Sequence, residues 1–182
     1  IESRVDKLLA EMTLDEKIGQ MSQFDPGGGN IEQLKKAVRD GRCGSLLNYF
    51  GVDKINEIQA VAAKESRLGI PLIIGRDVIH GYRTVFPIPL GMAASWDPEM
   101  VRKSFHISAI EASSQGIKWT FAPMVDITWD PRWGRIAEGC GEDPFLASSL
   151  AKAMVEGIQG DSLTDPTTLA ACVKHYAGYG FS

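Results

Sequence analysis

The chain lacks the sequence features of several large classes of protein. Its three cysteines, Cys43, Cys140 and Cys172, have no Cys-x-x-Cys spacing, which argues against a zinc site and against a disulfide framework. No apolar run approaches the length of a membrane span, and the first residues have the pattern of a helix rather than of a signal peptide. With 19 basic and 23 acidic residues the net charge is −4, so we expect neither nucleic acid nor a membrane as partner.

The phosphate-binding motifs of nucleotide enzymes are also missing. No GxGxxG follows the first predicted strand, and GxxxxGK[ST] does not occur. The glycine run 27–29 precedes a helix but has no preceding strand and no Lys or Ser/Thr partner, so we interpret it as a linker. The sequence therefore predicts no cofactor and no metal ion.

What remains is the composition of an ordinary soluble globular protein. The 182 residues are 44% hydrophobic and 23% charged, which is enough for one core or for part of a larger domain. Residues 1–22 have the pattern of two short helices, the second opened by a capping box, Thr13-Leu-Asp-Glu16. After the glycine run, Asn30 is predicted to cap a helix that ends near Gly41.

From residue 30 onward, apolar segments alternate with amphipathic ones. We predict strands over 44–50, 71–77, 119–126 and 169–178. The intervening helices begin near residue 53, at Asp97-Pro98 and at Asp143-Pro144, and each ends near a glycine. This order is typical of parallel βα units, in either an α/β barrel or an open doubly wound sheet. In both architectures ligands bind at the carboxyl ends of the strands.

Polar side chains are found at those strand ends, namely Asn48, Arg76-Asp77, Asp126 and Lys174-His175. A carboxylate such as Asp77 can accept two hydrogen bonds from neighbouring sugar hydroxyls, although it could instead be a structural partner for an arginine. His80, three residues later, is more simply a local hydrogen-bonding residue than a base. A lysine at the end of an apolar strand is costly to bury without a partner, which favours a functional role for Lys174. For His175 to share its pocket, the strand must bend or bulge, or both residues must lie just beyond its regular part.

The loop from Asp126 to Pro144 holds seven charged residues, two tryptophans and three glycines without helical or strand periodicity. One arginine of its DPRWGR sequence could point at a ligand while the other holds the loop, and we assign the second role to Arg132. Trp129 and Trp133 could stack on a sugar, but packing beneath the loop is the simpler interpretation. We expect Asp143 to cap the following helix and Glu142 to be a first-turn charge.

Three long motifs together resemble one enzyme family. RDVIHGYRTVFPIPLGMAASWDP, APMVDITWDPRWGRIAEGCGEDPFL and VKHYAGYG are similar, in order and spacing, to the N-terminal barrel domain of glycoside hydrolase family 3. The closest likeness is to bacterial periplasmic-type β-glucosidases. It implies the first half of a (β/α)8 barrel, with residues 1–29 as N-terminal helices and linker and 30–182 as βα units of a single incomplete domain.

The resemblance also implies roles for particular residues. Asp77, Arg135, Lys174 and His175 would bind the hydroxyls of the sugar in the −1 subsite. The family's nucleophilic aspartate follows the seventh strand and its acid/base usually comes from a second domain, so we expect no catalytic residue in this chain. The β-N-acetylglucosaminidase branch has KHFPGHG where this sequence has KHYAGYG. Ala177 and Tyr179 therefore favour the glucosidase or xylosidase side.

These observations predict part of a retaining, exo-acting β-glucosidase that hydrolyses terminal non-reducing β-D-glucosyl residues. Its expected partners are a β-glucoside, the remainder of the barrel and a second α/β domain, and its expected location is periplasmic or secreted. An isolated half-barrel leaves apolar faces and strand edges uncovered, so we expect it to self-associate. The alternatives are a β-xylosidase of the same family, a non-catalytic carbohydrate-binding half-barrel and a metabolite-binding open sheet.

Overall fold

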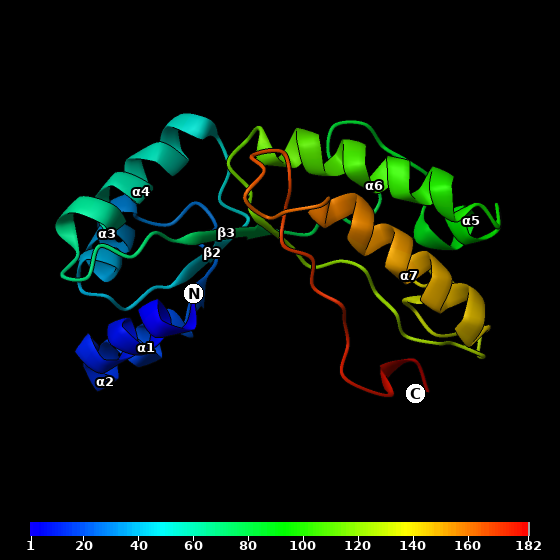
Figure 1. The fold of residues 1–182 in the computed structure, drawn as a ribbon, viewed down its shortest axis with the longest axis horizontal. Coiled ribbons are helices and arrows are strands. Elements are labelled where there is room, and N and C mark those ends of the chain that lie inside the picture. Colours follow the sequence, from blue (N-terminus) through cyan, green and yellow to red (C-terminus); the bar gives the residue numbers. More distant parts are fainter. Residues whose placement is uncertain (182) are drawn as a thin grey trace. The chain divides into compact units, whose positions relative to one another are not determined.

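The computed structural model describes residues 1–181, which form two compact units (Figure 1). The first comprises Ile1–Gly75 and the second begins at Arg76. The strands of the first unit follow one another in chain order in the sheet and pair in parallel. Helices flank the strands, so the predicted α/β class with parallel strands is confirmed. Among the described residues, no helix is long and apolar enough to cross a membrane.

The first unit alternates helices and strands over its whole length. Its elements are α1 (Glu2–Glu11), α2 (Leu14–Gln20), β1 (Gln23–Phe24), α3 (Ile31–Arg39), β2 (Ser45–Leu47), α4 (Val52–Glu65) and β3 (Ile73–Arg76). In the sheet Leu46 lies between Phe24 on one side and Ile74 on the other. These strands pack against α3 and α4 through a buried core that includes Val38, Leu46, Ile58 and Ile74.

Local sequence signals account for the ends of most of these helices. Thr13 and Glu16 form the predicted capping box, and the side chain of Asn30 accepts from the backbone N–H of Glu32 at 2.9 Å. The sequence did not predict strand β1, because two exposed residues carry no periodicity. The predicted segment 169–178 is therefore the fifth extended segment of the chain rather than the fourth.

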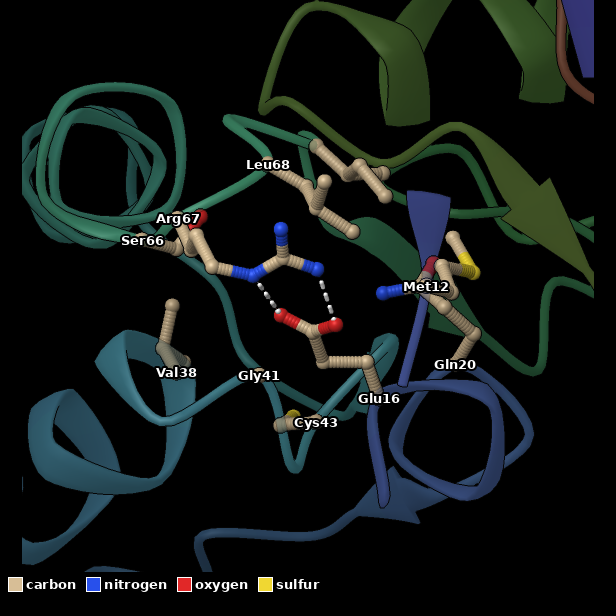
Figure 2. A pocket seen from close by; sticks show the side chains of 10 residues that line it. Met12, Glu16, Gln20, Val38, Gly41, Cys43, Ser66, Arg67 and Leu68 are labelled. Atoms are coloured by element: carbon tan, nitrogen blue, oxygen red, sulfur yellow. Dashed lines mark hydrogen bonds and ion pairs between the residues drawn. The ribbon is translucent and has the colours of Figure 1, made fainter. Parts of the chain in front are cut away.

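Glu16 and Arg67 join the second helix to the end of α4. Figure 2 shows the guanidinium of Arg67 facing the carboxylate of Glu16, beside a pocket of about 20 Å³. Nε of Arg67 donates to Oε1 of Glu16 at 2.8 Å, and Nη2 donates to the carbonyl of Glu11 at 2.8 Å. The hydrogen bonds from Arg67 and then from the backbone of Thr13 lower the pKa of Glu16 to about 2.

A variant Arg67→Met is expected to lose stability in a pH-dependent way. Because the folded-state pKa of Glu16 lies below its ordinary value, the ion pair stabilises the fold fully above about pH 4.5. That contribution is lost as the pH falls toward about 2. The difference in free energy of unfolding between wild type and variant should therefore shrink between these two pH values, as measured by urea unfolding. Arg4→Met, at an exposed arginine of α1, is the control. A difference that does not change with pH would contradict the assignment.

The second unit is built on two long helices that pack along each other. Its elements are α5 (Pro89–Ala93), α6 (Pro98–Ser113), β4 (Trp119–Thr120), the 3-10 helix η1 (Ile136–Glu138), α7 (Pro144–Gln159) and the 3-10 helix η2 (Tyr179–Phe181). In Figure 1 α6 and α7 run side by side. At Gly157 a Cβ atom would lie 2.3 Å from the carbonyl oxygen of Arg102, so only glycine permits this approach. Asp97 and Asp143 cap the two helices as predicted.

The predicted strands 119–126 and 169–178 are only partly confirmed. Regular strand is limited to Trp119–Thr120, and the two segments otherwise meet through the isolated parallel bridges Trp119↔Ala170 and Met124↔Lys174. These bridges are five residues apart on one segment and four on the other, so the first segment carries one extra residue. Pro123 in this segment has no N–H to donate to a ladder.

Candidate functional site

A cluster of charged side chains lies in the second unit, on three segments that are distant in the sequence. Asp77 directly follows β3, Arg135 belongs to the long loop that begins at Asp126, and Lys174 and His175 end the last extended segment. The structure brings the four residues predicted to bind substrate into two contacting pairs, Asp77 with Lys174 and Arg135 with His175, which meet at the adjacent residues Lys174 and His175. What they bind stays a prediction from the sequence.

Lys174 and Asp77 form an ion pair with unequal exposure. Nζ of Lys174 lies 3.4 Å from Oδ1 of Asp77, and the lysine side chain is 14% exposed whereas that of the aspartate is 51% exposed. The sequence left open whether Asp77 is a structural partner for an arginine. In the structure Asp77 does have a cationic partner, but this partner is Lys174. Because half of its surface stays open, the carboxylate can still accept hydrogen bonds from a ligand.

His175 lies between the carboxylate of Asp126 and the guanidinium of Arg135. Its Nδ1 lies 2.8 Å from Oδ2 of Asp126, whose side chain is only 3% exposed, and its backbone N–H donates to the same oxygen at 3.3 Å. Its Nε2 lies 3.3 Å from Nη1 of Arg135. Since a guanidinium can only donate, Nε2 accepts, and the ring proton is placed on Nδ1, which donates to Asp126.

Arg135 is oriented by a bidentate pair with Glu138 on η1. Its Nε and Nη2 donate to the two carboxylate oxygens, each at 2.7 Å. This pair raises the pKa of Arg135 above its usual range and lowers the pKa of Glu138. The positive charge of Lys174 lowers the pKa of Glu138 further. Glu138 therefore holds Arg135, the arginine that the sequence assigned to the ligand rather than to the loop.

Two residues of this cluster were not among the predicted binding residues. Asp126, which orients His175, had been noted only as a polar strand end. The ring of Tyr179 lies edge-on to His175 and to Trp133, with centroids 4.8 and 5.3 Å away, and beneath the guanidinium of Arg135. The local signal for Tyr179 was its aromatic character in the KHYAGYG motif, but its contacts depend on the loop.

Other polar residues singled out in the sequence lie outside the cluster. Arg132 pairs with Asp130 two residues away, and Nδ1 of His80 lies 3.0 Å from the carbonyl oxygen of Phe86, so both have local roles. Trp133 is half-buried, in line with the packed interpretation. Trp129 is different, because it is 66% exposed while its Nε1 donates to the carbonyl of Glu142 at 3.2 Å.

The cluster combines charged hydrogen-bond donors with charged acceptors. Two cations and three carboxylates offer charged donors and acceptors at short range, and such bonds are stronger than neutral ones. No group of His, Cys, Asp and Glu among the described residues is arranged to hold a metal ion. Burial raises the pKa of Cys140 to about 11, so its thiol stays protonated at neutral pH.

Comparisons with known proteins agree on one family. The model described as "Glycosyl hydrolase family 3 N terminal domain" matches residues 13–182. The "Periplasmic beta-glucosidase" of Salmonella typhimurium is 44% identical over 177 residues, which are 97% of this chain and 23% of the relative. A "Putative beta-xylosidase" of Formosa agariphila is 32% identical, with 99% of this chain and 27% of the relative covered.

Among solved structures, β-glucosidase from Listeria innocua in complex with glucose superposes with a TM-score of 0.89 at 45% identity. The match covers 99% of this chain and 27% of that protein. The chain thus spans about a quarter of the length of the relatives it matches.

Proposed function

The chain belongs to glycosyl hydrolase family 3, and from this premise we propose that it is part of a retaining, exo-acting β-glucosidase. The observation that carries the proposal is the joined cluster of Asp77, Lys174, His175 and Arg135. The first unit and the helices of the second supply the scaffold, and the cluster supplies binding groups for the terminal glucosyl residue.

In the proposed site the exposed carboxylate of Asp77 accepts from two neighbouring hydroxyls of the sugar. Lys174, whose Nζ has three N–H donors, donates one to Asp77 and has donors left for a sugar oxygen. Asp126 and Glu138 are positioning residues, because they touch His175 and Arg135 rather than the ligand. Charged bonds to hydroxyls accelerate the reaction if they strengthen in the transition state.

The two carboxylates of a retaining mechanism are proposed to lie outside residues 1–182. One attacks the anomeric carbon and the other protonates the leaving oxygen. Every acidic residue of the cluster already has a cationic or imidazole partner. The greater length of the relatives leaves room for the rest of the barrel and for a further domain.

A variant Asp77→Ala of the full-length enzyme is expected to lower kcat/KM for nitrophenyl β-D-glucopyranoside by at least about tenfold. The loss of one charged acceptor, about 1.5–3 kcal/mol, corresponds to that range. Asp130→Ala, which removes a carboxylate that pairs with the exposed Arg132 in the described part of the chain, is the matched control and should retain wild-type kinetics. Wild-type kinetics for Asp77→Ala would contradict the proposal that Asp77 binds the substrate.

The second candidate is β-xylosidase activity, which is favoured by the similarity to the Formosa agariphila protein. A xyloside lacks the hydroxymethyl group that a glucoside carries at C5. A difference in kcat/KM between the two substrates therefore measures how the pocket accommodates that group. We expect nitrophenyl β-D-glucopyranoside to be hydrolysed with the higher kcat/KM of the two. A preference for the xylopyranoside would select the second candidate instead.

We propose a periplasmic or secreted location, which the name of the Salmonella typhimurium relative supports. Three free cysteines, two of them buried, are compatible with such a compartment.

A further inference from the structure

We propose that the first unit carries a carbohydrate-binding pocket of its own, which takes a neutral pyranoside between the loop after β1 and the loop after β2. The inference goes beyond the proposed function, because the pocket is formed by the first unit alone. Only the choice of a glucoside as the probe rests on that function.

The pocket lies where parallel α/β folds bind ligands. It has a volume of about 690 Å³, within the usual range of small-molecule sites, and both loops that line it leave the carboxyl ends of neighbouring strands. Asp25 is the first residue after β1 and Asn48 the first after β2. The side-chain amide of Asn48 donates to Oδ2 of Asp25 at 3.4 Å, so the two strand ends are linked at the pocket.

One side of the pocket is apolar and aromatic. Tyr49 and Phe50 follow Asn48, and Ile31 and Leu34 of α3 complete this side. Phe50 is 53% exposed, so a large aromatic surface faces solvent at the pocket. An aromatic ring offers a flat apolar surface that suits the C–H-rich face of a pyranose.

The other side is polar and nearly balanced in charge. Asp25 and Glu57 are acidic, Lys54 is basic, and Nζ of Lys35 lies 2.7 Å from Oε1 of Glu57. The three charged lining residues, Asp25, Glu57 and Lys54, sum to −1, and Lys35 offsets one of the two acids, so no excess of positive charge favours a phosphate or another anion. Carboxylates accept from hydroxyl groups, and burial raises the pKa of Tyr49, so its phenol remains a neutral donor. The combination fits a polyhydroxylated, uncharged ligand with one apolar face.

The glycine run that the sequence suggested to be a linker forms part of the wall. Gly27 and Gly28 have φ angles of 46° and 83°, which only glycine adopts readily, and the N–H of Gly27 donates to Oδ1 of Asp25 at 3.0 Å. No heavy atom lies within 4 Å of a Cβ built on Gly28. The run therefore turns the chain around Asp25 while leaving the space beside it open.

The test uses methyl 1-thio-β-D-glucopyranoside, which resists hydrolysis, and titration calorimetry of the full chain in an Asp77→Ala background. That background weakens the site of the second unit, so a pocket in the first unit accounts for more of the remaining binding, and the further variants identify its share. We expect Phe50→Ala, added to this background, to weaken the remaining binding at least fivefold. Asp25→Asn is the second variant, and Phe145→Ala, at an exposed phenylalanine of α7, is the control.

Three outcomes are decisive. Binding that survives Asp77→Ala and is weakened by Phe50→Ala and by Asp25→Asn, but not by Phe145→Ala, supports the pocket. Complete loss of binding in Asp77→Ala alone overturns the pocket and leaves the proposed function intact. Remaining binding that neither Phe50→Ala nor Asp25→Asn changes, with melting temperatures like that of the parent, also overturns it.

Discussion

Replacing Arg135 by methionine in the full-length enzyme is expected to lower kcat/KM for an aryl β-glucoside by about 100-fold. The change removes a charged donor proposed to face the substrate and also leaves the partly buried Glu138 without its bidentate partner. Nη1 of Arg135 no longer donates to Nε2 of His175, so the imidazole loses one of its two anchors. A loss of about 3 kcal/mol corresponds to the stated factor.

The control is the second arginine of the same DPRWGR motif. Arg132 is exposed and, among residues 1–181, pairs with Asp130, so Arg132→Met should leave kcat/KM within about twofold. Arg135→Lys keeps the charge but lacks the planar fork that binds Glu138 through two bonds, so it should recover only part of the activity. Equal kinetics for the two methionine variants would contradict a special role for Arg135.

Phe105→Ala is expected to destabilise the second unit by about 3–5 kcal/mol, the usual cost of emptying a buried phenylalanine site. Phe105 lies on α6 with its side chain only 2% exposed, and its Cβ would be 3.0 Å from a Cβ built on Gly157 of α7. The void would thus open where the two helices approach most closely, and Gly157 has no side chain to fill it. Urea unfolding followed by circular dichroism measures the change.

Phe145→Ala removes the same side chain from a position that is 82% exposed at the first turn of α7. Its expected effect is below about 0.5 kcal/mol, because no core contact is lost. Both variants replace phenylalanine by alanine, so the difference between their free energies of unfolding measures the effect of burial. A loss below about 0.5 kcal/mol for both variants would mean that the α6–α7 contact contributes little to stability.

Helix ends were predictable because their signals are local. Asp97, Asp143 and Thr13 each cap a helix through an N–H no more than three residues away. The short helix α5 was not predicted, since Pro89–Ala93 has too few residues to show a period.

Strand lengths were not predictable to the same degree. The apolar run 119–126 suggested eight residues of strand, yet only Trp119–Thr120 is regular. Whether an apolar residue belongs to a strand depends on the partner that bonds its N–H and C=O groups. In this region the partner segment is in register at Ala170 and again at Lys174, with one extra residue between the bridges on the 119–124 side.

By itself the sequence determined the α/β class, the order of the βα units, the helix caps and the residue types at the strand ends, because each depends on neighbours within a few positions. Only the tertiary structure decided that Asp126 orients His175, that Glu138 holds Arg135, and that Asp77 pairs with a lysine 97 residues away. Only the tertiary structure also decided that the glycine run lines a pocket, beside the hydrogen bond from Asn48 to Asp25. The physical reason is that a hydrogen bond depends on angle and on distances within a few tenths of an ångström, and folding sets both.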